Sequence, residues 1–406
     1  MNKLLFKGGL FILLISILHA CDSTEKKVGT SSATKQVVSD SLPWSERMAQ
    51  SIMLRHPELW TTENAEEVKW NYKTGLLATA FLELYEESGN EEYFAYVKEY
   101  ADDVIDENGK ILNYKMEDYN IDNINAGKML FQVYEQTKDP KYKIALDTLF
   151  KQYSGHPRTP SGGLWHKKIY PNQMWLDGLY MGAPFFTEYN VTFGEGEIID
   201  DIIMQFRLIY NKTYDEETGL LYHAWDESKK MEWADNKTGL SPNFWSRAMG
   251  WYMMALVDVL DLIPEDHKGR GELINYLNEL SEALAKQQDE SGLWYQVTDL
   301  HDKEGNYLET SSTSMFIYAW AKGVKEGYLP QKYQTLAQKA YDGMTTKFTT
   351  VDPDGKVNIT NVCKSAGLGG DPYRDGSFEY YISEPIRVNH LHGTGPFILA
   401  SIYMNQ

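Results

Sequence analysis

Two aspartates stand at equivalent places in a repeated pattern, each between a long loop and an apolar run with helical spacing. These are Asp122 and Asp177. Other polar and aromatic residues occupy the same loops or the starts of similar runs: Tyr72, His166, Lys167, Trp175, His223, Trp245, Arg247, residues 310–313 and His392. Carboxylates transfer protons, cations bind acidic groups, and indole rings stack on sugars. The combination predicts a site for a carbohydrate that carries an acid.

Each of these residues also has a structural alternative. Asp122 and Asp177 could be helix N-caps, which is a common role for aspartate. The histidines could be loop residues with satisfied hydrogen bonds, the tryptophans could belong to the core, and Arg247 could form a structural ion pair. The histidines and cysteines show neither His-x3-His nor Cys-x2-Cys spacing, so the sequence predicts no metal site and no cofactor.

The elements that would position these residues are helices. From Pro43 onward the apolar residues recur with helical spacing, and β-rich runs are short. The pattern predicts helices near 43–55, 70–87, 91–104, 122–137, 140–153, 177–189, 197–210, 245–262, 270–286, 311–326, 331–347 and 392–404. Every second helix, beginning with 70–87, is richer in Gly and Ala, which favours close packing near a central axis.

The links between these helices alternate between short turns and long loops. Each long loop carries a glycine turn with apolar or aromatic neighbours, which is typical of a small β-hairpin; the glycines are Gly109, Gly162 or Gly163, Gly219, Gly292 and Gly355. Helix hairpins linked in this way close into an all-α (α/α)6 toroid with all long loops on one face. The inner helices begin at that face, so their first residues should surround one pocket.

The composition restricts the class of partner. The chain has 406 residues, 42% of them apolar, and a formal net charge of -19. Because so acidic a protein repels phosphate backbones, we expect no nucleic acid partner.

The N-terminus has the features of an export signal. Basic Lys3 and Lys7 precede an apolar run at 10–18, and 18–21 resembles a bacterial lipobox. We expect a signal peptide at 1–20, lipidation of Cys21, a flexible tether at 21–42 and a catalytic domain at 43–406. The alternative is an ordinary signal peptide with an incidental cysteine. The expected location is that of an exported bacterial lipoprotein, periplasmic or associated with the outer membrane.

Three segments resemble one enzyme family. The block at 167–181, KKIYPNQMWLDGLYM, resembles the signature of the unsaturated rhamnogalacturonyl hydrolases, glycoside hydrolase family 105. The blocks WSRAMGW at 245–251 and ETSSTSM at 309–315 resemble two further segments of that family. The resemblance covers nearly everything after the tether. Family 88, the unsaturated glucuronyl hydrolases, is related and matches these blocks less well.

The resemblance implies a role for each residue. Asp177 matches the general acid/base of the family, and Asp122 matches its second pocket carboxylate. His223 and Arg247 match residues that position the substrate, and His166 and Lys167 match basic residues near the sugar. The pocket lining implied by the resemblance also includes Tyr72, Trp175, Trp245 and Trp251.

The implied substrate is an oligosaccharide whose non-reducing end is the 4,5-unsaturated uronic acid left by a polysaccharide lyase. Its ring is an enol ether, so water can be added across the C4=C5 bond without a glycosyl-enzyme, in contrast to saturated glycosides. Asp177 must then carry a proton, and we expect burial beside Asp122 to raise the pKa of one member of the pair.

Several alternatives remain open at this point. Products of pectic rhamnogalacturonan are favoured, and products of a sulfated algal polysaccharide of the ulvan type are the second choice. The same fold could also carry a hydrolase of saturated glycosides or a sugar epimerase. A lipid-anchored glycan-binding protein without catalysis is the non-enzymatic alternative.

Overall fold

The computed structural model describes residues 37–405. The predicted signal peptide, Cys21 and most of the predicted tether lie outside the described residues. Val38, near the end of that tether segment, is buried, and its N–H donates to the carbonyl oxygen of Asp354 at 3.1 Å. The last tether residues therefore pack against the loop that contains Gly355.

All the predicted helices are present in the described residues. Their bounds are α1 Trp44–Arg55, α2 Tyr72–Ser88, α3 Glu91–Val104, α4 Asp122–Asn125, α5 Lys128–Thr137, α6 Pro140–Gly155, α7 Leu176–Phe193, α8 Ile199–Thr213, α9 Ser246–Leu262, α10 Arg270–Lys286, α11 Thr310–Lys325, α12 Lys332–Lys347 and α14 Leu391–Met404. The run predicted at 122–137 is divided into α4 and α5. At the division the Gly127 N–H bonds to the Ile124 carbonyl, three residues back, and this contact tightens the turn.

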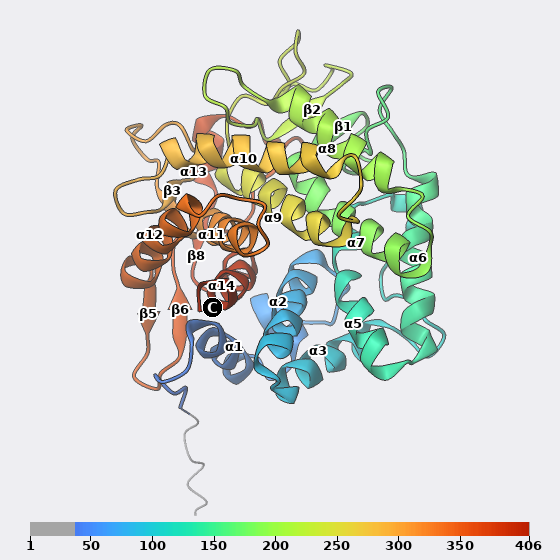
Figure 1. Cartoon of the computed structure of the whole chain (residues 1–406), viewed down its shortest axis with the longest axis vertical. Coiled ribbons are helices and arrows are strands. Elements are labelled where there is room, and N and C mark those ends of the chain that lie inside the picture. Colours follow the sequence, from blue (N-terminus) through green and yellow to red (C-terminus); the bar gives the residue numbers. More distant parts are fainter. Residues whose placement is uncertain (1–36, 406) are drawn as a thin grey trace, which may run out of the picture. The chain divides into compact units, whose positions relative to one another are not determined.

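The helices form two concentric rings (Figure 1). Contacts close the inner ring in the order α2, α4 with α5, α7, α9, α11 and α14, and α14 returns to α2. The remaining helices α1, α3, α6, α8, α10 and α12 pack outside them. This arrangement confirms the predicted all-α toroid and the assignment of every second helix to its inner ring.

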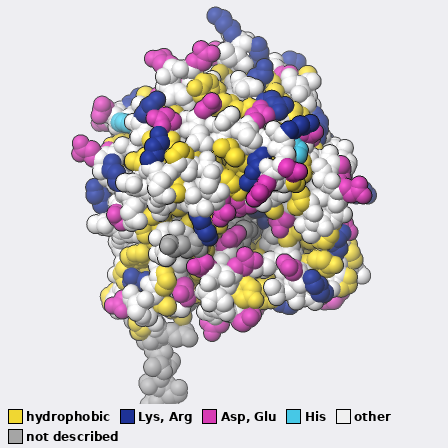
Figure 2. Space-filling model, in the orientation of Figure 1, with side chains coloured by type: hydrophobic (Ala, Val, Ile, Leu, Met, Phe, Trp, Pro, Cys, Tyr) yellow, Lys and Arg dark blue, Asp and Glu magenta, His cyan; other side chains and the backbone are white. Residues whose placement is uncertain are grey.

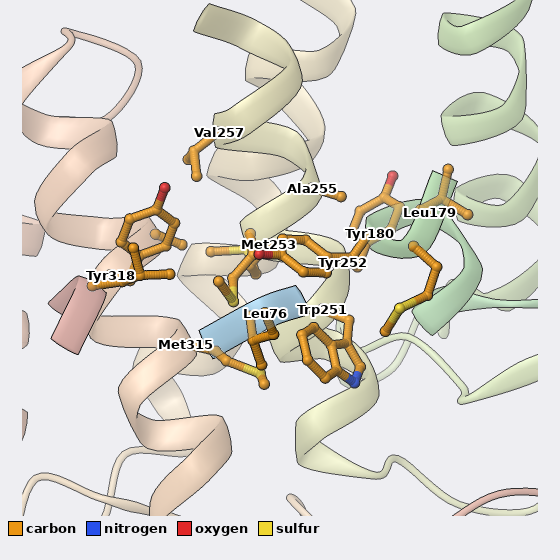
Figure 3. Packing of buried hydrophobic residues seen from close by; sticks show 14 of the residues in the cluster. Leu76, Leu179, Tyr180, Trp251, Tyr252, Met253, Ala255, Val257, Met315 and Tyr318 are labelled. Atoms are coloured by element: carbon orange, nitrogen blue, oxygen red, sulfur yellow. The ribbon is translucent and has the colours of Figure 1, made fainter. Parts of the chain in front are cut away.

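Small residues set the spacing of the inner ring. A side-chain carbon added at Gly75 of α2 would lie 2.4 Å from the Cα atom of Ala126, so only glycine allows this approach. Elsewhere large side chains fill the interior, where Trp251 and Tyr252 of α9 lie between Tyr180 of α7 and Met315 of α11 (Figure 3). The inner helix ends are therefore held at fixed positions by a densely packed core.

The long loops contain short strands. The five predicted turn glycines all have positive φ, from 75° at Gly109 to 94° at Gly162. A regular hairpin forms only around Gly355, while single bridges close the turns at Gly109, Gly162 and Gly219. The strands are β1 Gln173–Trp175 with β2 Ala224–Asp226, β3 Trp294–Tyr295 with β4 Leu308–Glu309, β5 Thr349–Val351 with β6 Val357–Ile359, and β7 Val362–Cys363 with β8 Ile386–Arg387.

The sequence did not predict one short helix, α13 Phe378–Ser383. It lies in the long link between α12 and α14, and Ser377 caps it by accepting a hydrogen bond from the Tyr380 N–H. Six residues are too few for a helical period to be recognised in the sequence.

The surface carries charges of both signs. Acidic and basic side chains are interspersed over the face shown in Figure 2. Among residues 37–405, no helix combines the length and apolar character that a bilayer span requires.

Candidate active site

The two aspartates begin inner helices without capping them. Asp122 is the first residue of α4 and Asp177 the second residue of α7, where Ile121 and Trp175 hold the cap positions. Neither carboxylate accepts a hydrogen bond from a helix N–H. By contrast, Asn71 caps α2 by accepting from two backbone N–H groups. The structure therefore excludes the N-cap alternative for both aspartates.

Both aspartates line one pocket at the N-terminal ends of the inner helices. Its volume is about 690 Å³ with its open mouth included. The lining residues are Tyr72, Lys73, Asp122, His166, Lys167, Tyr170, Trp175, Asp177, Met181, Ser365, Ala366 and Arg374. The bases Lys73, Lys167 and Arg374 stand beside two carboxylates, and the N-termini of α2 and α7 add positive partial charge. The pocket is suited to a sugar-sized anion.

Asp122 is held as an anion. Its Oδ2 lies 2.6 Å from Nζ of Lys167, and its Oδ1 lies 3.3 Å from Nε2 of His166. Burial alone would raise the pKa of Asp122, but the Lys167 ammonium and the neighbouring His166 together outweigh burial and lower it. The expected rise in pKa of one carboxyl therefore does not occur at Asp122. Burial also lowers the pKa of His166 to about 4, so this imidazole is neutral near pH 7.

Asp177 has different neighbours. Its Oδ2 lies 3.2 Å from Nε2 of His223, a fully buried side chain. On the other side of that ring, Nδ1 lies 2.8 Å from the hydroxyl of Tyr381, which comes from α13. No lysine or arginine pairs with Asp177 among the described residues, so its surroundings differ in charge from those of Asp122.

Stacked rings form one wall of the pocket. The His166 ring lies parallel to Trp175 with the centroids 4.4 Å apart, and Tyr170 stacks on Trp175 at 5.1 Å. Trp175 is fixed further because its indole N–H donates to Oε1 of Gln173. A rigid aromatic wall of this kind can hold a sugar ring with little loss of side-chain entropy.

Arg247 lies behind the pocket rather than in its lining. Its Nη1 donates to Oγ of Ser311 and to the carbonyl oxygen of Cys363, at 3.1 and 2.6 Å. The guanidinium also lies over the Trp245 ring at 4.7 Å. Its Nε and Nη2 are buried without a hydrogen-bond partner. A direct contact of Arg247 with substrate stays a prediction.

The other predicted residues fall into two groups. Tyr72 lines the pocket, and its hydroxyl lies 2.8 Å from Nε2 of His392. Trp245 and Trp251 are buried in the core below the pocket, where Trp251 stacks on Tyr180 at 4.9 Å. His223 is buried beside Asp177 and likewise does not line the pocket. The structure thus brings Tyr72, Asp122, Asp177, His166, Lys167 and Trp175 to one surface.

Several residues that line the pocket were missed in the sequence, as was Tyr381, which is buried behind His223. Lys73 follows Tyr72 at the start of α2, and Tyr170 lies within the 167–181 block, so position alone could have indicated both. Arg374 and Tyr381 come from the link between α12 and α14, where no period or motif marks them. Among residues 37–405, no cluster of three or more His, Cys, Asp or Glu side chains could hold a metal ion.

Comparisons with known proteins identify the family. The profile of the family described as "Glycosyl Hydrolase Family 88" matches residues 44–406. A solved structure of a glycoside hydrolase from family 105, from C. acetobutylicum ATCC 824, is 46% identical to this chain. It matches with a TM-score of 0.86 and covers 90% of this chain and 99% of its own.

Two curated proteins are more distant. The "Unsaturated rhamnogalacturonyl hydrolase YesR" of Bacillus subtilis is 28% identical over 75% of this chain and 84% of its own length. The "Unsaturated 3S-rhamnoglycuronyl hydrolase" of Formosa agariphila is 26% identical over 56% of each chain. Taken with the toroid and its two-carboxylate pocket, these matches show that the chain belongs to glycoside hydrolase family 105, the unsaturated rhamnogalacturonyl hydrolase family related to family 88.

Proposed function

We propose that this enzyme removes the 4,5-unsaturated uronic acid from the non-reducing end of lyase-generated oligosaccharides by hydrating the C4=C5 bond. The main observation behind this proposal is that the two pocket carboxylates have different charged neighbours. Lys167 and His166 lower the pKa of Asp122, while Asp177 lies beside the imidazole of His223 and pairs with no lysine or arginine among the described residues. One carboxylate is therefore anionic, and the other is placed to donate a proton.

The reaction can be written with these residues. Asp177 transfers its proton to C4, the π electrons of the double bond form the new C–H bond, and positive charge develops at C5 and the ring oxygen. Water attacks C5 and gives its proton to the Asp177 carboxylate, which restores the acid. The hemiketal opens to a ketone at C5, and the hemiacetal left at C1 then releases the neighbouring sugar with its hydroxyl group.

Asp122 and the basic residues of the pocket position the water and the substrate for this hydration. The Asp122 carboxylate accepts a hydrogen bond from the attacking water and so orients its lone pair toward C5. The uronate carboxylate is bound by the bases that line the pocket, Lys73, Lys167 and Arg374. The sugar face stacks on the aromatic wall of Tyr170 and Trp175.

The test is the ultraviolet absorbance of the unsaturated uronate. A disaccharide with this sugar at its non-reducing end should lose the absorbance on incubation. One molecule of the neighbouring sugar should be released for each unsaturated uronate consumed. The disaccharide with a saturated uronate is the control and should stay intact. Saturable binding of intact polysaccharide without loss of absorbance would instead favour a glycan-binding protein.

The favoured substrate is a product of pectic rhamnogalacturonan. This choice draws on the similarity to the Bacillus subtilis protein, whose name states that activity and which matches over 84% of its length. The Formosa agariphila protein, named for a 3S-rhamnoglycuronyl substrate, supports a sulfated ulvan-type product as the second candidate. Release rates from a panel of lyase-generated disaccharides would rank the two.

We also propose that the enzyme is exported and anchored by a lipid on Cys21. The support is the lipobox-like sequence at 18–21 behind a basic and apolar leader. In a bacterial host, the protein should take up a labelled fatty acid and sediment with membranes, and Cys21→Ala should do neither. A labelled Cys21→Ala protein would contradict this assignment.

A further inference from the structure

A second hollow adjoins the candidate active site. It is a groove of about 930 Å³ with its open side included, formed by Tyr170, residues 370–374 and the α13 region. Its lining shares Tyr170 and Arg374 with the pocket of Asp122 and Asp177. A sugar attached to a uronate in the pocket can therefore extend directly into this groove.

The wall between pocket and groove is firmly held. Nη2 of Arg374 donates to the hydroxyl of Tyr170 at 3.0 Å and to the carbonyl oxygen of Leu368 at 3.1 Å. Nε of Arg374 donates to the carbonyl oxygen of Gly369 at 2.7 Å. The Tyr170 ring is stacked on Trp175. These three hydrogen bonds hold Arg374 as a fixed divider between the pocket and the groove.

The groove presents aromatic rings and carboxylates. Tyr373 is 42% exposed, and its ring is fixed because its hydroxyl accepts a hydrogen bond from the Trp233 N–H at 2.8 Å. Asp371 and Glu384 add two carboxylates, and Arg374 is the only base in the described lining. Aromatic faces favour a sugar ring, whereas two carboxylates repel a sulfate group.

We propose that this groove binds the sugar linked to the unsaturated uronate and selects a neutral sugar over a sulfated one. The inference rests on the proposed function, because it assumes that the uronate occupies the pocket. Asp371 and Glu384 are the residues that reject the anionic substituent, and Tyr373 provides the stacking surface. The enzyme then acts on products whose neighbouring sugar has no sulfate.

The first test compares two disaccharides that share the unsaturated uronate and carry rhamnose either unmodified or 3-sulfated. The wild-type kcat/KM should be at least about tenfold higher for the neutral compound, and the ratio should shrink as salt screens the repulsion. Equal turnover of both compounds, or faster turnover of the sulfated one, would overturn the groove assignment while leaving the hydrolase intact. Turnover of neither compound would instead overturn the proposed function.

The second test asks whether Glu384 sets the preference for the neutral sugar. Glu384→Gln should raise the ratio of sulfated to neutral kcat/KM several-fold, because it removes one negative charge and keeps the side-chain shape. Glu326→Gln makes the same change in net charge beyond the end of α11 and should leave the ratio unaltered. The same ratio in Glu384→Gln as in Glu326→Gln would contradict the role of Glu384.

The third test asks whether the groove is occupied. Tyr373→Ala should lose more kcat/KM on the neutral disaccharide than on the methyl glycoside of the same uronate, whose aglycone is too small to reach the ring. Because both substrates are measured on one preparation, a loss of folded enzyme affects them equally. Equal losses on the two substrates would refute binding in the groove.

Discussion

The hydroxyl of Tyr381 lies 2.8 Å from Nδ1 of His223, although 158 positions separate the two residues. The opposite nitrogen of the same ring, Nε2, lies 3.2 Å from Asp177. Tyr381 is itself fixed, because its ring stacks on Trp245 at 5.8 Å and its carbonyl oxygen accepts from Nε2 of Gln296. A residue of the short helix α13 thus sets the orientation of the imidazole beside the proposed acid.

Tyr381→Phe should therefore change the protonation behaviour of the site. Without the hydroxyl, His223 loses the partner that fixes its tautomer, and we expect kcat to fall about tenfold with a shifted pH-rate profile. Tyr341→Phe removes a comparable buried hydroxyl, one that donates to Oγ of Ser401 far from the pocket, and should keep the wild-type profile. A pH-rate profile that is unshifted in Tyr381→Phe would show that Tyr381 contributes only packing.

Asp177→Asn should abolish most of the turnover without unfolding the protein. The amide cannot donate a proton to C4, and removal of a proton-transfer group costs about 10²- to 10⁴-fold in rate. Release of the neighbouring sugar measures the rate, and thermal unfolding checks the fold. Asp266→Asn, in the turn between α9 and α10, provides the matched control. Full turnover in a folded Asp177→Asn protein would eliminate Asp177 as the acid.

Lys167→Met should move the acidic limb of the pH-rate profile to higher pH. The Lys167 ammonium, with His166, lowers the pKa of Asp122 against the effect of burial. When the ammonium is removed, that pKa rises, and the anion needed to orient water is lost at a higher pH as the solution is acidified. KM should also rise because Lys167 lines the pocket.

The pH dependence of kcat separates the two expected effects of Lys167→Met, which are the higher pKa of Asp122 and the weaker binding of substrate. A change in KM alone, with the limb unmoved, would show that the ionisation of Asp122 does not limit the reaction. A limb displaced toward lower pH would contradict the electrostatic assignment, because removing a positive neighbour cannot favour the carboxylate.

Gly75→Ala should destabilise the fold and Gly271→Ala should not. The added carbon at Gly75 would lie 2.4 Å from the backbone of Ala126, so α2 and α4 must separate, at a cost of about 1–3 kcal/mol or more. At Gly271 of α10 the same carbon meets nothing within 4 Å, and alanine is the better helix former. Urea unfolding measures the free energy of unfolding of both variants, and unchanged m values show that the two are comparable with the wild type.

A second effect of Gly75→Ala is expected at the site. Tyr72 and Asp122 begin the two helices that would be pushed apart, so kcat/KM should fall in the folded variant while Gly271→Ala keeps its activity. A Gly75→Ala protein as stable as the wild type would show that α2 and α4 can separate without cost.

The sequence alone determined the helices and their order. Helical period and turn glycines are local properties, and an alternation of short and long links between helix hairpins closes into few arrangements other than a ring. For the same reason the convergence of Tyr72, Asp122 and Asp177 at one mouth could be predicted. The predicted roles of Asp177 and the other site residues came from the resemblance to the family.

The tertiary structure decided the features that depend on contacts across the chain. The link between α12 and α14 has no period, so neither the approach of Tyr381 to His223 nor the position of Arg374 beside Tyr170 could be predicted. The sequence placed two carboxylates in one pocket, but only the pairing of Lys167 with Asp122 decided which of them is held as the anion. Such pairings depend on distances of a few ångströms between distant segments, and local sequence patterns carry no information about those distances.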